Sequence, residues 1–328
     1  MIFYFLLLLI SGVLLFFAAH RIVKGIIFLA HYLQWREFVI AFFVMAIASS
    51  IPNLFVGISS ALHDIPELSF GDVMGNSVVD LTLVAALAGL FGKKLSTLSN
   101  IIQISSLITI VAAVLPILLV IDGSLGRGDG VILLLAFVSY SFWLFLKRKE
   151  HPDIFNHQKA EEPVRRFRHF LLTGADMMLS ILLILLSAEG VVRAAKFFAA
   201  SLNVPIPLIG ILVVGFGSSL PELYFGITAA RKGKYLVVLG EIMGSVIVIT
   251  TLVLGIVALI NPIEISDFSP FAIARVFLVV ASLFFFLFVR SDRKVTRGEA
   301  LTLLLLYAAF LTAELFHHQI LLFFGFTP

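Results

Sequence analysis

Ten apolar segments alternate with short polar connections along this chain. Most are long enough to cross a bilayer as a helix, which needs roughly 20 residues. The first and sixth segments continue into the amphipathic stretches RIVKGIIFLAHYLQW (21–35) and GVVRAAKFFAASL (190–202). The pattern predicts an all-α polytopic membrane protein of ten transmembrane helices, at about 2–19, 37–62, 68–91, 100–121, 129–147, 170–199, 205–230, 235–260, 268–290 and 298–320.

One stretch of the chain occurs twice. Residues 46–80 and 215–249 align without a gap when the numbering is shifted by 222 − 53 = 169. A repeat that keeps its register over a whole helix pair indicates a duplicated fold. The shift places Ser49 on Ser218, Ser50 on Ser219, Pro52 on Pro221, Asn53 on Glu222, Gly71 on Gly240, Asp72 on Glu241, Met74 on Met243 and Gly75 on Gly244.

The repeat divides the chain into two halves of five spans each. Because five is odd, the second half enters the membrane in the opposite direction to the first. We predict a first five-helix repeat over residues 1–147, a cytoplasmic connection over 148–168 and a second repeat over 169–328. Inverted repeats with helices kinked near the midplane are typical of secondary transporters.

Composition supports a membrane protein and excludes some functions. Hydrophobic residues make up 60% of the chain and charged residues 13%, whereas a soluble domain is about half apolar and a quarter charged. The basic residues lie between apolar spans, so they indicate membrane orientation rather than nucleic-acid binding. The chain has no cysteine, which excludes disulfides, thiol catalysis and cysteine metal sites.

The distribution of positive charge predicts the orientation. Arg21 and Lys24 follow the first apolar segment, and no clear cleavage signal accompanies it, so we expect a retained helix with its N-terminus outside. The inward connections then hold 19 of the 23 Lys and Arg residues. Since basic residues collect on the cytoplasmic side, we expect a multi-pass protein of the cell (plasma) membrane.

The second copy of the repeat carries polar residues inside an apolar helix. Ser218, Ser219 and Glu222 project from about the same side of that helix. Pro221 has no N–H, so the carbonyl of Gly217 loses its usual partner. A carboxylate, two hydroxyls and a free carbonyl are costly in lipid. The arrangement therefore favours a functional site over a packing kink.

The first copy supplies matching oxygen atoms. Asn76 and Asp80 are four residues apart and share one helix face. If the kinked helices meet near the midplane, Asp80 and Glu222 bring two negative charges to one pocket. Hard cations such as calcium, sodium or magnesium prefer oxygen ligands of this kind. The candidate residues are Ser49, Ser50, Asn53, Asn76, Ser77, Asp80, Ser218, Ser219, Glu222 and Ser245.

These motifs resemble a known family. GSSLPEL (217–223) followed by GEIMGS (240–245) is similar to the second alpha-repeat of the calcium/cation antiporter superfamily, the sodium/calcium exchangers. ASSIPNL (48–54) followed by GDVMGN (71–76) looks like a diverged first alpha-repeat. The resemblance covers nearly the whole chain and implies ten helices in two inverted repeats.

The resemblance also implies a cation site and a mechanism. One repeat would supply the ligands Ser49, Ser50, Asn53, Asn76 and Asp80, and the other Ser218, Ser219, Glu222 and Ser245. Backbone carbonyls near Ala46 and Gly215 would join them. The family further implies alternating access, in which the first helix of each repeat moves across a fixed core.

The chain departs from the family pattern at several positions. Asn53 stands where the family usually has a glutamate, and Ile249 where it usually has Asn or Asp. Asp80 stands where Asn is common, and Asp72 and Glu241 both replace an Asn. Asp72 and Glu241 fit an access or proton site and a structural pair equally well. The transported ion and the driving ion are left open by these exchanges.

Other polar and small residues have simpler explanations. Gly71, Gly75, Gly240 and Gly244 have GxxxG spacing, which close helix packing explains. Asp176, Glu189 and Glu314 lie near helix ends or lack a clear repeat partner, so snorkelling or local pairing is favoured for them.

We therefore predict a secondary active antiporter that exchanges calcium or another cation for sodium. It would need no cofactor, and its partners would be inorganic cations and the lipid bilayer. A proton-coupled or monovalent-selective exchanger is an alternative, because Asn53 removes one acid. A passive channel or a membrane scaffold is a further alternative. An enzyme is disfavoured, because no nucleophile–base set or metal triad is visible.

Overall fold

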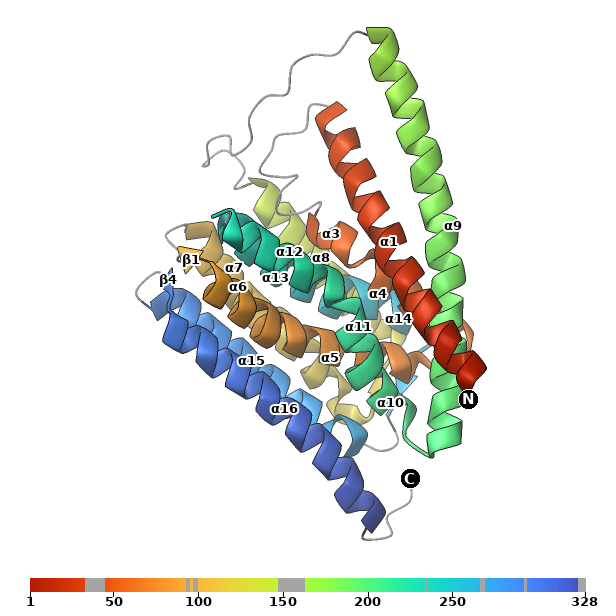
Figure 1. Cartoon of the computed structure of the whole chain (residues 1–328). Coiled ribbons are helices and arrows are strands. Elements are labelled where there is room, and N and C mark those ends of the chain that lie inside the picture. Colours follow the sequence, from red (N-terminus) through yellow and green to blue (C-terminus); the bar gives the residue numbers. More distant parts are fainter. Residues whose placement is uncertain are drawn as a thin grey trace.

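The computed structural model describes residues 1–32, 45–92, 95–96, 100–146, 163–233, 235–265, 269–291 and 294–323. Over these residues the chain is almost entirely helical (Figure 1). Nine helical runs are long and apolar enough to cross a membrane, and Ile51–Leu62 is a shorter apolar helix. The predicted all-α membrane fold is confirmed. The predicted span 37–62 lies partly outside the described residues, as does most of the predicted connection 148–168.

The first half begins with α1 (Ile2–Tyr32), which contains the first span. A broken helix follows, and then a long run that contains the π-helical turn Asp80–Val84. The elements after α1 are α3 (Met45–Ser49), α4 (Ile51–Leu62), α5 (Pro66–Val79), α6 (Ala85–Phe91), β1 (Leu95–Ser96), α7 (Asn100–Leu119), β2 (Ser124–Leu125) and α8 (Arg127–Leu146).

The second half repeats this order. Its elements are α9 (Pro163–Leu202), α10 (Ile206–Ile209), α11 (Gly215–Ser218), α12 (Leu220–Arg231), α13 (Tyr235–Ile247), α14 (Leu254–Ile260), β3 (Ile263–Glu264), α15 (Ala272–Arg290), β4 (Lys294–Val295) and α16 (Arg297–Phe323). π-helical turns cover Gly210–Val214 and Val248–Val253.

Helix boundaries follow the 169-residue shift. Adding 169 to α4, 51–62, gives 220–231, which are the bounds of α12. Adding 169 to α6, 85–91, gives 254–260, the bounds of α14. The π-helical turn at 80–84 shifts to 249–253, which lies within its counterpart at 248–253. The internal repeat of the sequence is therefore a repeat of structure.

Two short antiparallel strand pairs join the halves. β1 pairs with β4 through Leu95 and Val295, and β2 pairs with β3 through Leu125 and Ile263. The shift moves β1 onto β3 and β2 onto β4 to within one residue. The two strand pairs are therefore equivalent under the same symmetry, and each bonds one half to the other by backbone hydrogen bonds.

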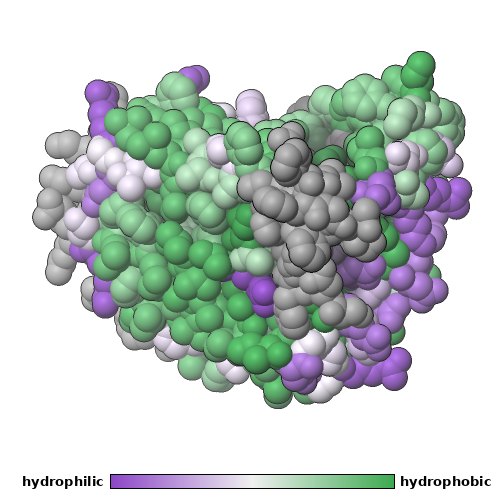
Figure 2. All heavy atoms as spheres, turned by 90° about the horizontal axis from the view of Figure 1, so that it is seen from below, coloured by the Kyte–Doolittle hydropathy of each residue, from purple (hydrophilic) through white to green (hydrophobic). Residues whose placement is uncertain are grey.

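The core is formed by the two runs that follow the broken helices. In the spans Pro66–Phe91 and Val237–Ile260, 83% of the apolar stretch is buried, compared with 22% in Arg127–Leu146. α1 packs along α9 at one side of this core, and α15 and α16 lie at the opposite side (Figure 1). Hydrophobic residues cover a broad part of the outer surface (Figure 2). That surface suits lipid contact.

Glycines let α5 approach the segment 206–218 closely. A Cβ atom on Gly71 would lie 2.5 Å from the carbonyl oxygen of Pro207. A Cβ atom on Gly75 would overlap the carbonyl oxygen of Ile211 and lie 2.8 Å from its Cα. The packing role predicted for Gly71 and Gly75 is confirmed, and it brings α5 against the second broken helix.

Replacing Gly75 with alanine is expected to destabilise the fold, because the obstacle is backbone that cannot rotate away. Overpacking costs about 1–3 kcal/mol, and we expect the upper end. The measurement is the thermal unfolding midpoint of the purified protein. Gly12→Ala in α1 is the control, since nothing lies within 4 Å of a Cβ there. Equal midpoints for the two variants would contradict the close approach.

Candidate functional site

Each half contains one broken helix, and the two breaks have the same geometry. α3 ends and α4 begins at Ser50, with φ −82° and ψ −3°. α11 ends and α12 begins at Ser219, with φ −81° and ψ −4°. Pro52 and Pro221 lie in the first turn after the break. Because proline has no N–H, the helices break where the sequence predicts a kink.

The serines at the breaks bond back to their own helices. Ser49 and Ser50 donate to the carbonyl of Ala46, at 3.2 and 2.8 Å. Ser218 and Ser219 are placed to donate to the carbonyl of Gly215, at 3.2 and 2.9 Å. The hydroxyl oxygens keep lone pairs that can accept a hydrogen bond or coordinate a cation.

Asp72 joins the two halves. The Asn53 amide lies 3.2 Å from Asp72 Oδ2 and donates to it. The Ser218 hydroxyl lies 2.9 Å from Asp72 Oδ1. Asn76 donates its amide to the Ser218 hydroxyl at 2.8 Å. Asn53, Asp72 and Asn76 are fully buried. Three predicted site residues thus meet around an acid whose role the sequence leaves open.

A second group of acids has no such partners. Asp80, Glu222 and Glu241 are at most 1% exposed. Within the described residues, none of their six carboxylate oxygens has a hydrogen-bond partner of normal geometry. Asp80 faces the hydroxyls of Ser219 and Ser245. The three carboxylates are close enough to repel one another.

Unpaired buried carboxylates need a positive charge. Removing an ion from water costs several kcal/mol unless an opposite charge compensates it. In the part of the chain that the structure describes, neither these three acids nor Asp72 has an ion pair. Burial and mutual repulsion therefore make this cluster attractive to cations.

The available ligands are oxygen atoms. Besides the carboxylates, the buried oxygens of Asn53, Asn76, Ser77 and Ser245 lack partners among the described residues. Over the same residues, no three acidic or histidine side chains converge as a metal centre. A cation would therefore need hydroxyl, amide or carbonyl oxygens beside one or two carboxylates, a set that suits a hard cation.

Most of the predicted residues lie together. Asn53, Asn76 and Ser218 gather around Asp72, and Ser219, Ser245, Asp80 and Glu222 form the neighbouring group. The Ser50 hydroxyl donates to the carbonyl of Ala46 in α3, its one side-chain hydrogen bond within the described residues. Asp72 and Glu241 belong to the cluster, and their repeat equivalence was the one sequence signal for it. Ile249 is packed in the hydrophobic core.

A cavity reaches one end of this cluster. It measures about 60 Å³ and is lined by Ala19, His20, Ser49, Pro221, Glu222, Phe225 and Glu241. One water molecule needs roughly 10–15 Å³, so the cavity holds several. Because the halves are inverted, the turns after α4 and α12 lie at opposite faces, called here the His63 face and the Arg231 face. The cavity lies toward the Arg231 face.

The repeat-related positions toward the His63 face are packed. Phe225 lines the cavity, whereas its counterpart Val56 is 2% exposed within the core. Ala19, itself 2% exposed, has the counterpart Ala188, which is 1% exposed and packs in the same hydrophobic cluster as Val56. The site therefore has a cavity on the side of the Arg231 face and packed side chains at the equivalent positions on the other side.

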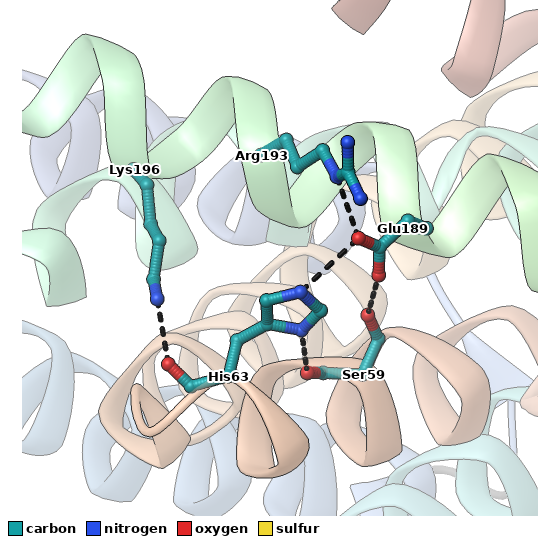
Figure 3. A network of polar contacts seen from close by, with 5 residues as sticks. All are labelled: Ser59, His63, Glu189, Arg193 and Lys196. Atoms are coloured by element: carbon teal, nitrogen blue, oxygen red, sulfur yellow. Dashed lines mark hydrogen bonds and ion pairs between the residues drawn. The ribbon is translucent and has the colours of Figure 1, made fainter.

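A polar cluster of Ser59, His63, Glu189, Arg193 and Lys196 joins α4 to α9 on the closed side (Figure 3). Glu189 accepts hydrogen bonds from Arg193 at 2.6 Å and from Ser59 at 3.1 Å. His63 Nε2 lies 3.1 Å from Glu189, and Lys196 donates to the His63 carbonyl at 2.6 Å. We call this set the α4–α9 cluster.

The α4–α9 cluster has no equivalent at the Arg231 face. The shift places His20 on Glu189 and His63 on Lys232. Two basic side chains cannot form the carboxylate–imidazole contact that Glu189 makes with His63. The difference between the two faces therefore follows from the residue types at these positions. The local pairing predicted for Glu189 and Asp176 is confirmed, since Asp176 pairs with Arg21 at 3.3 Å.

Comparison with known proteins gives consistent matches. A family model described as "Sodium/calcium exchanger protein" matches residues 3–146 and 175–316. The chain is 28% identical over 306 residues to "Inner membrane protein YrbG" of Escherichia coli (strain K12), covering 90% of this chain and 92% of that protein. It is 26% identical over 342 residues to "Sodium/calcium exchanger MaX1" of Methanosarcina acetivorans, covering 94% and 97%.

A solved structure gives the same result. The chain matches the sodium–calcium exchanger NCX_Mj with a TM-score of 0.65 and 26% identity, covering 95% of this chain and 98% of that one. The family model, the length of the matched proteins and the matched fold are therefore consistent with one another.

Proposed function

Since the chain belongs to the sodium/calcium exchanger family, a family of membrane transporters and not of enzymes, we propose that it exchanges calcium or another cation for sodium. The observation that carries this proposal is the buried, unpaired pair Asp80 and Glu222 between two inverted halves. The proposed ligands are Ser49, Ser50, Asn53, Asn76, Asp80, Ser218, Ser219, Glu222 and Ser245.

Charge compensation couples the ions. An empty site leaves carboxylates unpaired in a low dielectric, which opposes closure around it. A bound cation neutralises that charge, so occluded and exchanged states become accessible. Because one cation must leave before another binds, the same carboxylates link the two ion gradients.

The two faces supply the alternating states. We propose that the N-terminus lies outside and that the protein resides in the cell membrane. The repeats would span 1–147 and 169–328, with a cytoplasmic connection at 148–168. The Arg231 face is then cytoplasmic, and the cavity belongs to an inward-open state. Movement of the α1–α9 pair across the core would close this cavity and break the α4–α9 cluster.

Transport by the purified protein in proteoliposomes tests the proposal. We expect calcium-45 uptake that saturates and that depends on an outwardly directed sodium gradient. Proton-driven uptake that does not depend on sodium would favour a proton-coupled exchanger. That alternative is based on Asn53, which stands in place of an acid. Flux that neither saturates nor needs a counter-ion would favour a channel.

Glu189→Gln is expected to shift the protein toward the state that is open at the His63 face. The Glu189–His63 contact links α9 to the end of α4, and a partly exposed pair of this kind contributes about 0.2–1 kcal/mol, so the shift should be up to about fivefold. The chain lacks cysteine, so a single Val56→Cys substitution can report accessibility through its rate of reaction with a methanethiosulfonate reagent.

Asp176→Asn in the same Val56→Cys background is the matched control. It removes the Arg21–Asp176 pair, which lies between α1 and α9. The helices α1 and α9 move together as one unit in the proposed transition, so the Val56→Cys reaction rate should not change. An equal rate increase in both variants would argue against a specific latch at Glu189.

A further inference from the structure

The departures from the repeat pattern place the acids on one side of the site. Glu222 has Asn53 as its counterpart, and Asp80 has Ile249. Both neutral residues come from the elements that form the His63 half of the site. Both acids face Glu241, whose carboxylate is repelled by Asp80 and acts in turn on Glu222. The side of the site near the cavity therefore holds three carboxylates, those of Asp80, Glu222 and Glu241. The side toward the His63 face holds Asp72.

Glu241 differs sharply from its counterpart Asp72. Asp72 accepts hydrogen bonds from Asn53 and Ser218. Glu241 is 1% exposed, and neither of its oxygens has a partner in the described part of the chain. Glu241 is instead one of the residues around the cavity that Glu222 and Ser49 also line. A purely structural carboxylate would be expected to have the hydrogen bonds that Asp72 has.

We propose that Glu241 is a cation-binding residue, forming with Glu222 an access site for a divalent cation at the cavity end of the cluster. The proposal rests on the proposed cation exchange. Glu241 is six residues into α13, so it lies nearer the Arg231 face than Ser245 does. A hydrated cation that enters the cavity meets Glu241 before it reaches Asp80. Carboxylate and hydroxyl oxygens beside a cavity with room for water suit calcium, which keeps water among its ligands.

The first experiment measures calcium binding to the purified full-length protein by isothermal titration. Glu241→Gln keeps the size of the side chain and removes its charge, so we expect calcium affinity to fall about tenfold, as for a supporting ligand. Glu314→Gln is the matched control. Glu314 is 3% exposed with one oxygen unpartnered, and it lies on α16, outside the site. Its substitution should leave the affinity unchanged.

The second experiment asks where Glu241 acts. Phe225→Cys, on the cavity wall, should react with a methanethiosulfonate reagent, whereas Val56→Cys, its packed counterpart, should react far more slowly. Calcium should slow the reaction of Phe225→Cys about tenfold at a concentration near ten times the dissociation constant. In the Glu241→Gln background the same calcium concentration should protect about half of the sites or fewer. Glu314→Gln in the same Phe225→Cys background should leave the protection unchanged.

The outcomes separate the two proposals. If the unaltered protein neither binds nor exchanges a cation, the proposed function fails. If it does both, and Glu222→Gln abolishes them while Glu241→Gln keeps full affinity and full protection of Phe225→Cys, the proposed function stands and the role of Glu241 is overturned. Lower affinity together with weaker protection of Phe225→Cys in Glu241→Gln, and neither effect in Glu314→Gln, supports the access site.

Discussion

Glu222→Gln is expected to lower cation exchange by about 100-fold or more, the upper end of the effect seen when metal sites lose a supporting group. Glu222 is the acid to which Asp80, Glu241 and Asp72 are all electrostatically linked. It also follows Pro221 at the break between α11 and α12, where both halves meet. Glutamine keeps the volume and one oxygen, so the change removes charge rather than packing.

The measurement is sodium-dependent calcium-45 uptake into proteoliposomes, with the thermal midpoint of the variant checked beside it. Because the Glu222 carboxylate has neither an ion pair nor a hydrogen bond of normal geometry among the described residues, removing its charge relieves repulsion, and the midpoint without cation should be equal or higher. Glu314→Gln is again the control. Retained exchange in Glu222→Gln would show that the site lies elsewhere. Lost exchange together with a lowered midpoint would point to a structural role.

Much of this fold follows from the sequence, because the two halves carry independent copies of the same information. Pro52 and Pro221 occupy equal positions under the 169-residue shift, and the helices break at the residues just before them. The apolar pattern locates the spans, since each must satisfy its own backbone hydrogen bonds in lipid. The GxxxG spacing predicts the packing role of Gly75, although the sequence does not identify Ile211 as its neighbour.

The repeat in the sequence predicts only some of the site residues. Asn53 and Asp72 are 19 residues apart, and their hydrogen bond depends on how α4 packs against α5. The repeat equates Asp72 with Glu241, but one of them is fully hydrogen-bonded and the other lines a cavity. In the proposed alternating-access cycle, this difference arises because the two halves surround the site in different conformations. A linear repeat cannot record which half is closed.

The charge distribution explains why a chain without an acid at position 53 can still form a cation site. Asn53 donates to Asp72, so the negative charge sits one hydrogen bond away from the position where the family usually has a glutamate. Glu222, Asp80 and Glu241 supply the other charges. The chain thus has four buried acids around the site, and three of them are grouped at the cavity end, so the charge is displaced toward the cavity. Affinity and the direction of easier ion release should both depend on that displacement.

Exchanging the two side chains tests whether charge or position matters on the closed side. Asp72→Asn alone is expected to lower calcium affinity about 10- to 100-fold, because it removes a charge and the acceptor that orients Asn53 and Ser218. The double variant Asn53→Asp, Asp72→Asn reverses the donor and the acceptor with almost no change in volume. It restores the charge count, so we expect at least about tenfold of the lost affinity to return, a coupling that a double-mutant cycle isolates.

Asn53→Asp alone adds a fifth carboxylate. This variant should bind calcium more tightly, and in the absence of calcium it should unfold at a lower temperature. If the double variant binds as weakly as Asp72→Asn, the carboxylate must sit at position 72 itself, and the exchange of charge between these neighbours cannot account for the missing acid.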